Sequence, residues 1–478
     1  MNNELTTSGS GIGPSINGGE VMASGGFGCI FTPELKCKNQ GLKREGPRGV
    51  SKLMLSKYAK EEYEDTIKYK HILSKIPNYK DYFLLDGFSM CDPAPLSKSD
   101  LKHYKTRCKA LQKRNITKKQ VNKRLSELKI INMPYGGEDL GDYIESNRTP
   151  ADLANMNDAM INLLKNGILP MNELGVYHLD VKESNILIDF IGGKTRVKLI
   201  DWGLSSTYNE EAGDQIPDTL IRRSFQYNVP MSIALFTRQF KREYAAFLET
   251  AQSPDFDVIS EFVSKYLVAT FEERGTGHFI TIHEILQGIF KHKMTSRFKS
   301  KEEKDNESPF HYLNDVLIDY TGLSKNEKYV VSHDVVVEYL TEILMQYTYN
   351  GEFHLKQYFD EIFVKNVDIW GFIMSYSVVL EAYYANYSEL NKDENLAYDK
   401  LRNIFVTHLF ASPLTVIDAE ELLSNLSELS KLWRNTSFSK EEIKLQKESA
   451  FSMSSEEEEQ ATVVTNESIK VIDALLKK

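Results

Sequence analysis

The first quarter of the chain carries short apolar runs separated by turn residues, a pattern typical of β-strands. Strands are predicted at 21–23, 30–31, 50–55, 83–85 and 130–133. A charged stretch over 57–76 repeats its apolar positions with helical spacing and stops at Pro77-Asn78. A lysine-rich stretch over 98–129 also predicts helix. This part of the chain is therefore expected to be small and rich in β-structure.

After Gly136-Gly137 the pattern becomes mainly helical. One predicted strand pair interrupts it, at 186–189 and 196–200, joined by glycines 192 and 193. Residues 205–366 contain the periodicity of several helices and little that is typical of strands. Together the two patterns predict an α+β fold.

The composition indicates a folded interior with flexible ends. Of 478 residues, 41% are hydrophobic and 11% aromatic, which excludes wholesale disorder. We expect flexible tails at 1–19, rich in Gly, Ser and Asn, and at 431–478, which is polar. Ser454 and Ser455 precede four glutamates, so they could be phosphorylated by an acid-directed kinase or belong to a tail that only aids solubility.

The charge and the cysteines restrict the partners and the compartment. A formal net charge of -10 argues against general affinity for nucleic acid or anionic membranes. The basic stretch 98–129 is a local exception, for which a solvated helix is favoured over a site for nucleic acid or an acidic partner. The cysteines form no C-x-x-C pair, so we expect reduced thiols in a cytosol-like compartment. They are Cys29, Cys37, Cys91 and Cys108.

No targeting segment is recognised. The N-terminus lacks a basic region followed by an apolar run, and position 2 is not glycine, so neither secretion nor myristoylation is expected. No apolar run approaches the roughly 20 residues that span a bilayer. The sequence predicts a soluble cytoplasmic protein without membrane association.

A glycine-rich turn lies between the first two predicted strands. Glycines let backbone N–H groups approach phosphate oxygens without an intervening Cβ. A phenylalanine would cap the loop tip, and two apolar residues of the flanking strands would cover an adenine ring. The candidate nucleotide-binding residues here are Met22, Gly25, Gly26, Phe27, Gly28 and Ile30. Alone, such a turn is more often structural.

Lys52 lies among apolar residues in the predicted strand 50–55. A lysine that points inward needs anionic partners, because burying it unpaired is expensive. A phosphate and a carboxylate of the following helix would satisfy it. Among Glu61, Glu62 and Glu64, the position relative to the helix end favours Glu64. A surface lysine is the alternative interpretation.

The strongest group of chemical side chains lies in HLDVKESNIL, residues 178–187, just before a predicted strand. Asp180 can accept or orient the proton of an acceptor hydroxyl. Lys182 can neutralise charge on a transferred phosphoryl group, and Asn185 can ligate a metal. Leu187 would form the floor under an adenine ring. Alone, the segment also fits a polar turn that leads into a strand.

Asp201 follows the next predicted strand, in KLIDWG. A carboxylate at a strand end, released by a glycine, is placed to hold Mg²⁺ between the β- and γ-phosphates of ATP. Phosphoryl transfer must hold a polyanion, supply a divalent metal and align an acceptor hydroxyl. Lys52, Asp180, Asn185 and Asp201 supply all three functions if they converge on one cleft between two lobes.

These segments resemble the motifs of eukaryotic-type protein kinases. The run INMPYGG at 131–137 resembles the hinge of that family, with Met133 as gatekeeper and the Tyr135 backbone as an adenine contact. The run VDIWG resembles the start of a central helix, whose aspartate, here Asp368, hydrogen-bonds the backbone of the catalytic loop.

The resemblance implies a bilobal fold, with a small β-rich N-lobe over 20–135 and a helical C-lobe over 136–430. It implies ATP and Mg²⁺ as cofactors and an unidentified protein as substrate. Serine/threonine specificity follows from Lys182, two positions after Asp180. The long gap between Asp201 and Asp368 makes 205–366 a helical insert, with Asn228-Val229-Pro230 as the nearest substitute for the family's Ala-Pro-Glu motif.

Such a divergent chain resembles the kinases of large cytoplasmic DNA viruses, which implies the host cytoplasm or the virion. The alternatives are a pseudokinase scaffold, which usually lacks one of the four key residues, and a small-molecule kinase of the same superfamily. The oligomeric state cannot be inferred from the sequence.

Leu179 stands where many kinases have an arginine that pairs with a phosphate of the activation loop. We therefore expect activity that does not require phosphorylation of that loop. Phosphatase treatment of an active preparation should leave the rate unchanged, and abolition of activity by phosphatase would refute this expectation.

Overall fold

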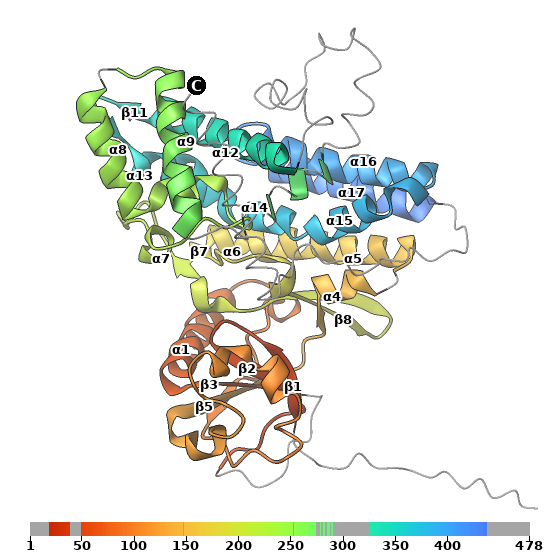
Figure 1. The fold of residues 1–478 in the computed structure, drawn as a ribbon. Coiled ribbons are helices and arrows are strands. Elements are labelled where there is room, and N and C mark those ends of the chain that lie inside the picture. The colour runs from red at the N-terminus through yellow and green to blue at the C-terminus, as the bar shows by residue number, and fades with distance from the viewer. Residues whose placement is uncertain are drawn as a thin grey trace, which may run out of the picture. The chain divides into compact units, whose positions relative to one another are not determined.

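The protein has an α+β fold in which antiparallel sheets accompany a larger number of helices (Figure 1). The structure, a computed structural model, describes residues 19–38, 49–146, 148–251, 253–273 and 325–436, with single positions between 278 and 289. The predicted tail 1–19 lies outside this range except for Gly19. The predicted C-terminal tail lies outside it from residue 437 onward.

The chain divides into two compact units. Unit 1 takes residues 1–70 and 85–135, and unit 2 takes 71–84 and 136–478. The change after Tyr135 falls at the predicted end of the N-lobe. The segment 71–84 was expected in the N-lobe, but it belongs to unit 2. Its Leu84 N donates to Leu199 O at 3.1 Å. The predicted strand at 83–85 is therefore wrong, and Phe83 forms only an isolated bridge with Leu199.

Unit 1 is built on a five-stranded antiparallel sheet with the order β1-β2-β3-β5-β4. Its strands are β1 (Glu20–Ser24), β2 (Gly28–Thr32), β3 (Gly49–Leu55), β4 (Ser89–Cys91) and β5 (Leu128–Pro134). The predictions for β1, β2, β3 and β5 are confirmed, with each boundary within two residues. Strand β4 was missed, because its three partly buried residues carry no clear alternation. Helix α1 (Ser56–Leu73) follows β3 as predicted.

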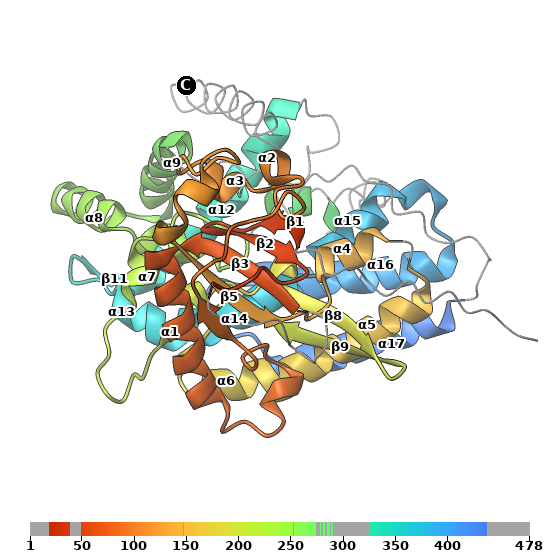
Figure 2. The ribbon, with the colours of Figure 1, turned by 90° about the horizontal axis from the view of Figure 1, so that it is seen from below.

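The lysine-rich segment 98–129 is not the long helix that was predicted. It contains two short helices, α2 (Tyr104–Arg107) and α3 (Lys109–Gln112), and 3₁₀ turns at Val121–Lys123 and Leu125–Glu127. The apolar side chains of the segment belong to or pack against one buried cluster with residues of β1, β2 and β5. The chain must turn repeatedly to bring them to one side, and Figure 2 shows α2 and α3 beside β1 and β2.

All four cysteines form disulfides, Cys29 with Cys108 and Cys37 with Cys91. The expectation of reduced thiols is therefore wrong for this structure. Nothing in the spacing of the cysteines indicated the pairing, because the partners lie 79 and 54 positions apart and meet only when segment 98–129 and β4 pack on the sheet.

Removing the Cys29–Cys108 disulfide is expected to destabilise unit 1. It closes a long loop, so a Cys29→Ser, Cys108→Ser variant should lose about 2–5 kcal/mol of unfolding free energy. Urea unfolding of the oxidised protein, the variant and the dithiothreitol-treated wild type would measure the loss. If the variant and the oxidised wild type unfold at the same urea concentration, this disulfide contributes nothing.

Unit 2 combines a small sheet with packed helices. Strand β8 (Ile186–Ile191) pairs with β9 (Lys194–Leu199) through a turn at Gly192 and Gly193, whose φ angles are 60° and 76°. This hairpin confirms the predicted strand pair, and β6 (Glu138–Asp139) extends it. The glycines are needed there because both positions of such a turn require positive φ.

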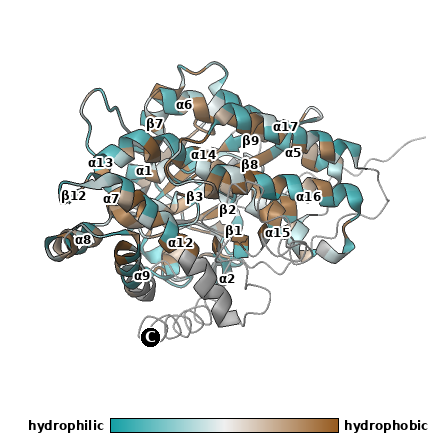
Figure 3. Ribbon diagram, turned by 90° about the horizontal axis from the view of Figure 1, so that it is seen from above, coloured by the Kyte–Doolittle hydropathy of each residue, from teal (hydrophilic) through white to brown (hydrophobic). Residues whose placement is uncertain are grey.

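The helices of unit 2 alternate hydrophilic and hydrophobic residues along their length (Figure 3). The long helices of this unit include α5 (Pro150–Leu163), α12 (Lys325–Tyr347), α14 (Val364–Met374), α15 (Ser377–Ala385), α16 (Lys392–Phe405) and α17 (Ala419–Asn435). Helix α17 packs along α5 and carries the fold to Asn435. The predicted tail 431–478 therefore begins too early, since its first residues form the last turns of this helix.

The described residues of 205–366 are mainly helical, as predicted. They include α7 (Asp218–Ile221), α8 (Arg238–Thr250) and α9 (Phe256–Glu273), and only short strand pairs.

One described helical run, Leu355–Ala385, is long and apolar enough to cross a membrane, although the sequence suggested no such run. Of its most apolar window, 89% is buried inside the protein. Helix α14, which lies within this run, is buried at nearly every position, so the run has the character of a core helix.

Candidate active site

Helix α14 anchors the segment 178–185, called the catalytic loop here after the role that the sequence predicts for it. The buried carboxylate of Asp368 accepts hydrogen bonds from the backbone N–H groups of His178 and Leu179, both at 2.8 Å. It also accepts one from the Asn172 side chain at 2.8 Å. The hydrogen bonds predicted for Asp368 are thus confirmed, and they join residues that lie 189 and 190 positions apart.

The same helix contacts a second segment, 223–230. Trp370 Nε1 donates to the Tyr227 carbonyl at 2.9 Å. A Cβ atom on Gly371 would lie 2.5 Å from Val181 O and 2.9 Å from Asn228 O. Only glycine allows so close an approach, so Gly371 lets α14 touch both segments at once.

Leu179 holds a strained backbone conformation at the centre of this anchor. Its φ is +62°, which is uncommon for a bulky side chain. Its N–H is bound by Asp368, and its carbonyl accepts a hydrogen bond from Arg223. Strain of this kind persists only where the surroundings over-determine it, and it clusters at functional sites.

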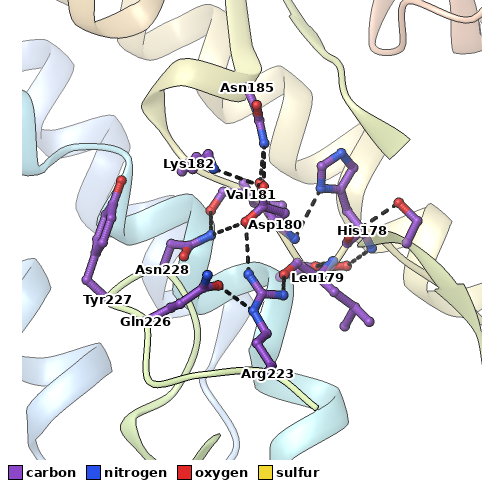
Figure 4. Close-up of polar contacts among 12 residues, drawn as sticks. His178, Leu179, Asp180, Val181, Lys182, Asn185, Arg223, Gln226, Tyr227 and Asn228 are labelled. Carbon is purple, nitrogen blue, oxygen red and sulfur yellow. Dashed lines mark hydrogen bonds and ion pairs between the residues drawn. The ribbon is translucent and has the colours of Figure 1, made fainter. Parts of the chain in front are cut away.

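Asp180 is the centre of the polar network drawn in Figure 4. Its carboxylate is about nine-tenths buried and has four donors. Oδ1 receives Arg223 Nη2 at 2.8 Å and Asn228 Nδ2 at 2.9 Å. Oδ2 receives Asn185 Nδ2 at 2.9 Å and Lys182 Nζ at 3.0 Å. A carboxylate offers about four acceptor positions, so this one is fully used and firmly oriented.

The surrounding charges keep Asp180 ionised. Burial alone would raise the pKa of its carboxyl, but the positive charges of Lys182 and Arg223 and the hydrogen bond from Asn228 lower it below the ordinary value. Burial lowers the pKa of the Arg223 guanidinium, and the Asp180 carboxylate opposes that effect. A carboxylate that stays ionised near neutral pH can accept a proton in a reaction.

His178 is fully buried under the catalytic loop. Its Nε2 lies 2.9 Å from Ile200 O, and its ring meets Trp202 edge-on at 4.9 Å. Burial lowers the pKa of His178, so the neutral imidazole is favoured. The contact of His178 with Ile200 connects the catalytic loop to the residue between the end of β9 and Asp201.

The two predicted metal ligands lie at the same end of the β8–β9 hairpin. Ile200 N donates to Asn185 O at 2.9 Å, which places Asp201 one residue beyond that bond. Asp201 is exposed and has a φ of +64°, a second non-glycine residue with positive φ at this site. Both Asn185 hydrogen bonds to Asp180 use the amide nitrogen, so its oxygen is the atom that could ligate a cation.

No three His, Cys, Asp or Glu side chains group as a metal site in the described part of the chain. One amide oxygen and one carboxylate do fit Mg²⁺, which usually takes one or two protein ligands and completes its octahedron with phosphate oxygens and water.

Sequence reasoning missed Arg223 and Tyr227, and it named Asn228 only as part of the substitute for an Ala-Pro-Glu motif. The signal for Arg223 was available: a buried carboxylate needs cations, and Arg222-Arg223 lie shortly before Asn228-Val229-Pro230, which was the predicted substitute for an Ala-Pro-Glu motif.

Tyr227 carries a second polar group beside the loop. Its hydroxyl donates to both carboxylate oxygens of Glu183 at 2.8 Å, and its ring stacks on His278 at 5.7 Å. Burial and the positive charges of Lys182 and Arg223 lower the pKa of His278 to about 4, so this imidazole is neutral at pH 7.

In unit 1, Lys52 is buried and pairs with Glu62, not with the predicted Glu64. Its Nζ lies 2.7 Å from both carboxylate oxygens of Glu62. Glu62 shares a face of α1 with the buried residues Ala59, Thr66, Tyr69 and Leu73, at spacings of three and four. Glu64 is exposed because it lies outside this face.

Neutralising Glu62 is therefore expected to matter, and neutralising Glu64 is not. Glu62→Gln removes the carboxylate of a mostly buried ion pair and should lower kcat/KM for ATP at least about tenfold. Glu64→Gln, on the same helix, should behave as wild type in the same steady-state assay. Equal effects of the two substitutions would contradict the assignment.

The glycine-rich turn lies next to Lys52 in the sheet. Gly25 N donates to Gly28 O at 3.0 Å, and a Cβ atom on Gly25 would lie 4.0 Å from Lys52 Cε. On β2, Ile30 pairs directly with Lys52. Gly26 has open space around it, so a ligand could approach its backbone.

The other candidate adenine contacts are distributed over both units. Unit 1 holds three partly exposed contacts, Met22, Phe27 and Tyr135, which are 41%, 49% and 39% exposed. It also holds Met133 of β5, which pairs with Val50 of β3. Unit 2 holds Leu187 of β8, which pairs with Lys198 of β9 and lies against Gly136.

Each unit thus brings its own set of predicted residues together: Lys52 with the glycine-rich turn in unit 1, and Asp180, Lys182, Asn185 and Asp201 in unit 2. The convergence of the two sets on one nucleotide remains a prediction. No protein-family model matches the chain, and no curated protein is significantly similar to it in sequence. Function is therefore inferred from these residues and their contacts.

Proposed function

We propose that this protein is a serine/threonine protein kinase of bilobal fold, which uses ATP and Mg²⁺ to phosphorylate another protein. One observation carries the proposal: Asp180 is a buried, ionised carboxylate, and each of its two oxygens is bound by a different pair of donors. Arg223 and Asn228 bind Oδ1, whereas Lys182 and Asn185 bind Oδ2.

This division suggests how the carboxylate would work. Lys182 and Asn185 are the side chains assigned to phosphate and metal by their position in the motif. Asn185 can bind the metal through its amide oxygen and keep its bond to Oδ2, whereas Lys182, on turning to the phosphates, leaves an acceptor position of Oδ2 available to an acceptor hydroxyl. Arg223 and Asn228 still hold Oδ1, so the carboxylate keeps its orientation during the exchange.

The proposed reaction transfers the γ-phosphoryl group of ATP directly to the acceptor hydroxyl. The acceptor hydroxyl oxygen forms a bond to the γ-phosphorus of ATP, and its proton passes to Asp180 Oδ2. The bond between the γ-phosphorus and the bridging oxygen breaks, and ADP leaves with the bonding electron pair. Bound Mg²⁺, held by Asn185 and Asp201, would supply charge neutralisation for the phosphate oxygens. Lys52, positioned by Glu62, would pair with the phosphates of the nucleotide.

Purified protein with Mg²⁺, γ-labelled ATP and an arrayed serine/threonine peptide library would test the proposal. Transfer of label is expected, and Asp180→Asn should reduce its rate by roughly 10²–10⁴-fold, because a positioned general base contributes about that factor. Asp189→Asn, on β8 away from the network, serves as the matched control and should retain activity.

Two outcomes would overturn the proposal in different ways. Binding of Mg²⁺-ATP without transfer to any acceptor would indicate a pseudokinase scaffold. Transfer only to small hydroxyl compounds would indicate a small-molecule kinase. If active protein is obtained, comparing phosphopeptides from cells that express wild type or Asp180→Asn would identify the substrate class.

A further inference from the structure

The segment 98–129 contacts the glycine-rich turn of its own unit at several points. Ala110 N, in α3, donates to Ser24 Oγ at 3.0 Å, just ahead of the turn. Just after the turn, Cys29 is joined to Cys108 by a disulfide. Both ends of the turn, residues 25–28, are therefore attached to the same short stretch of α2 and α3.

Arg114 adds a contact to the tip of the turn. Its Nη1 lies 3.3 Å from Gly26 O and 2.9 Å from Ala110 O. Its guanidinium lies 5.4 Å from the ring centroids of both Phe27 and Tyr58. The two rings contact each other at 4.8 Å, so the arginine, the tip phenylalanine and a residue of α1 form one cluster.

The cluster restricts the conformational freedom of the turn. Gly25 and Gly26 have little steric restriction, and Phe27 is half-exposed, so the turn by itself would have high conformational entropy. A guanidinium hydrogen bond and two cation–π contacts select one position for it. That position lies beside Lys52, since a Cβ atom added to Gly25 would lie 4.0 Å from Lys52 Cε.

We propose that Arg114 is a positioning residue that holds the glycine-rich turn in the conformation that binds the phosphates of ATP. The inference rests on the proposed kinase function and gives the basic segment 98–129 a role other than a solvated helix. Arg114 would act through the backbone of Gly26 and the ring of Phe27, without contact to the nucleotide. Preorganising the turn saves the entropy that binding would otherwise cost.

The test compares Arg114→Ala with Lys113→Ala, a neighbouring exposed residue of the same charge. Two measurements are made on the full-length protein. Hydrogen–deuterium exchange of a peptide that covers 22–31 reports the mobility of the turn without nucleotide. Titration with a fluorescent ATP analogue and Mg²⁺ reports nucleotide affinity.

For Arg114→Ala we expect faster exchange in this peptide and about tenfold weaker nucleotide binding. KM for ATP should rise with kcat nearly unchanged, and the melting temperature should stay close to that of wild type. Arg114→Lys, which keeps the charge without the planar guanidinium, should be intermediate. In Phe27→Ala, loss of Arg114 should have a smaller effect, because the two residues act together.

The outcomes separate the two proposals. Unchanged exchange and unchanged affinity in Arg114→Ala, with a wild type that binds ATP, would overturn the role of Arg114 and leave the kinase proposal intact. Faster exchange in a chain whose wild type binds no nucleotide would refute the kinase proposal and with it the nucleotide role of Arg114. Equal effects of Arg114→Ala and Lys113→Ala would reduce the role to general surface charge.

Discussion

Gly371→Ala is expected to lower activity about 10²-fold and to destabilise unit 2 by about 1–3 kcal/mol. The added methyl group would meet Val181 O at 2.5 Å and Asn228 O at 2.9 Å. Neither backbone atom can move without shifting the catalytic loop or the segment that orients Asp180. A displacement of about 1 Å at a reacting group can cost 10²-fold in rate.

Gly288→Ala is the matched control, because this glycine is also helical and buried. The nearest atom to its new Cβ would be a side-chain carbon of Leu380 at 3.7 Å, an ordinary contact. Alanine is the better helix former, so this variant should gain up to about 1 kcal/mol. Denaturant unfolding and the phosphotransfer rate would be measured for both variants. Wild-type behaviour of Gly371→Ala would disprove the close approach.

Arg223→Ala is expected to reduce the phosphotransfer rate at pH 7 by at least about tenfold and to cost about 3–5 kcal/mol of stability, because it leaves a buried carboxylate without one of its cations. The guanidinium makes hydrogen bonds to Asp180 Oδ1 and to the Leu179 carbonyl. It thereby neutralises the buried carboxylate of this loop from a segment more than forty positions away.

The pH dependence gives this prediction a specific sign. Arg223 and Lys182 both lower the pKa of Asp180. Without Arg223 that pKa rises, so activity should be lost at a higher pH on the acid side of the pH–rate profile. Stability has the same sign: the contribution of a carboxylate with a lowered pKa is present above the unfolded pKa and is lost as pH falls through the folded one.

Arg222→Ala controls for the loss of charge, since Arg222 pairs with Asp218 and both side chains are mostly exposed. It should change stability by less than about 1 kcal/mol and leave the pH–rate profile in place. Arg223→Lys tests whether charge alone is sufficient. A profile of Arg223→Ala that coincides with that of wild type would show that Lys182 and Asn228 keep Asp180 ionised without help.

The Lys52 pair shows how far sequence reasoning reached and where it stopped. Apolar neighbours placed Lys52 on an inward-facing strand position, and its burial demanded a carboxylate from the next helix. The choice of Glu64 was wrong, because the buried face of α1 contains Ala59 and Thr66, three and four positions from Glu62, and leaves Glu64 outside it. Which face of a helix is buried depends on the sheet against which it packs.

The segment 98–129 shows a different limit. Its many lysines favoured a helical stretch, and propensity alone does not oppose that interpretation. In the structure its apolar residues join a single cluster, and Cys108 pairs with Cys29. Tertiary burial overrode local preference, since a straight helix could not bring all of these side chains to one side.

By itself the sequence determined the local features: the strands β1, β2, β3 and β5, the glycine turn of the β8–β9 hairpin, and the order of polar residues in the catalytic loop. These depend on neighbouring residues and on backbone sterics, which act over a few positions. Tertiary structure alone decided which distant groups meet, such as Asp368 with the loop backbone and Arg223 with Asp180. Buried charges and polar groups require partners, but many residues could supply them, and only packing selects which one is within reach.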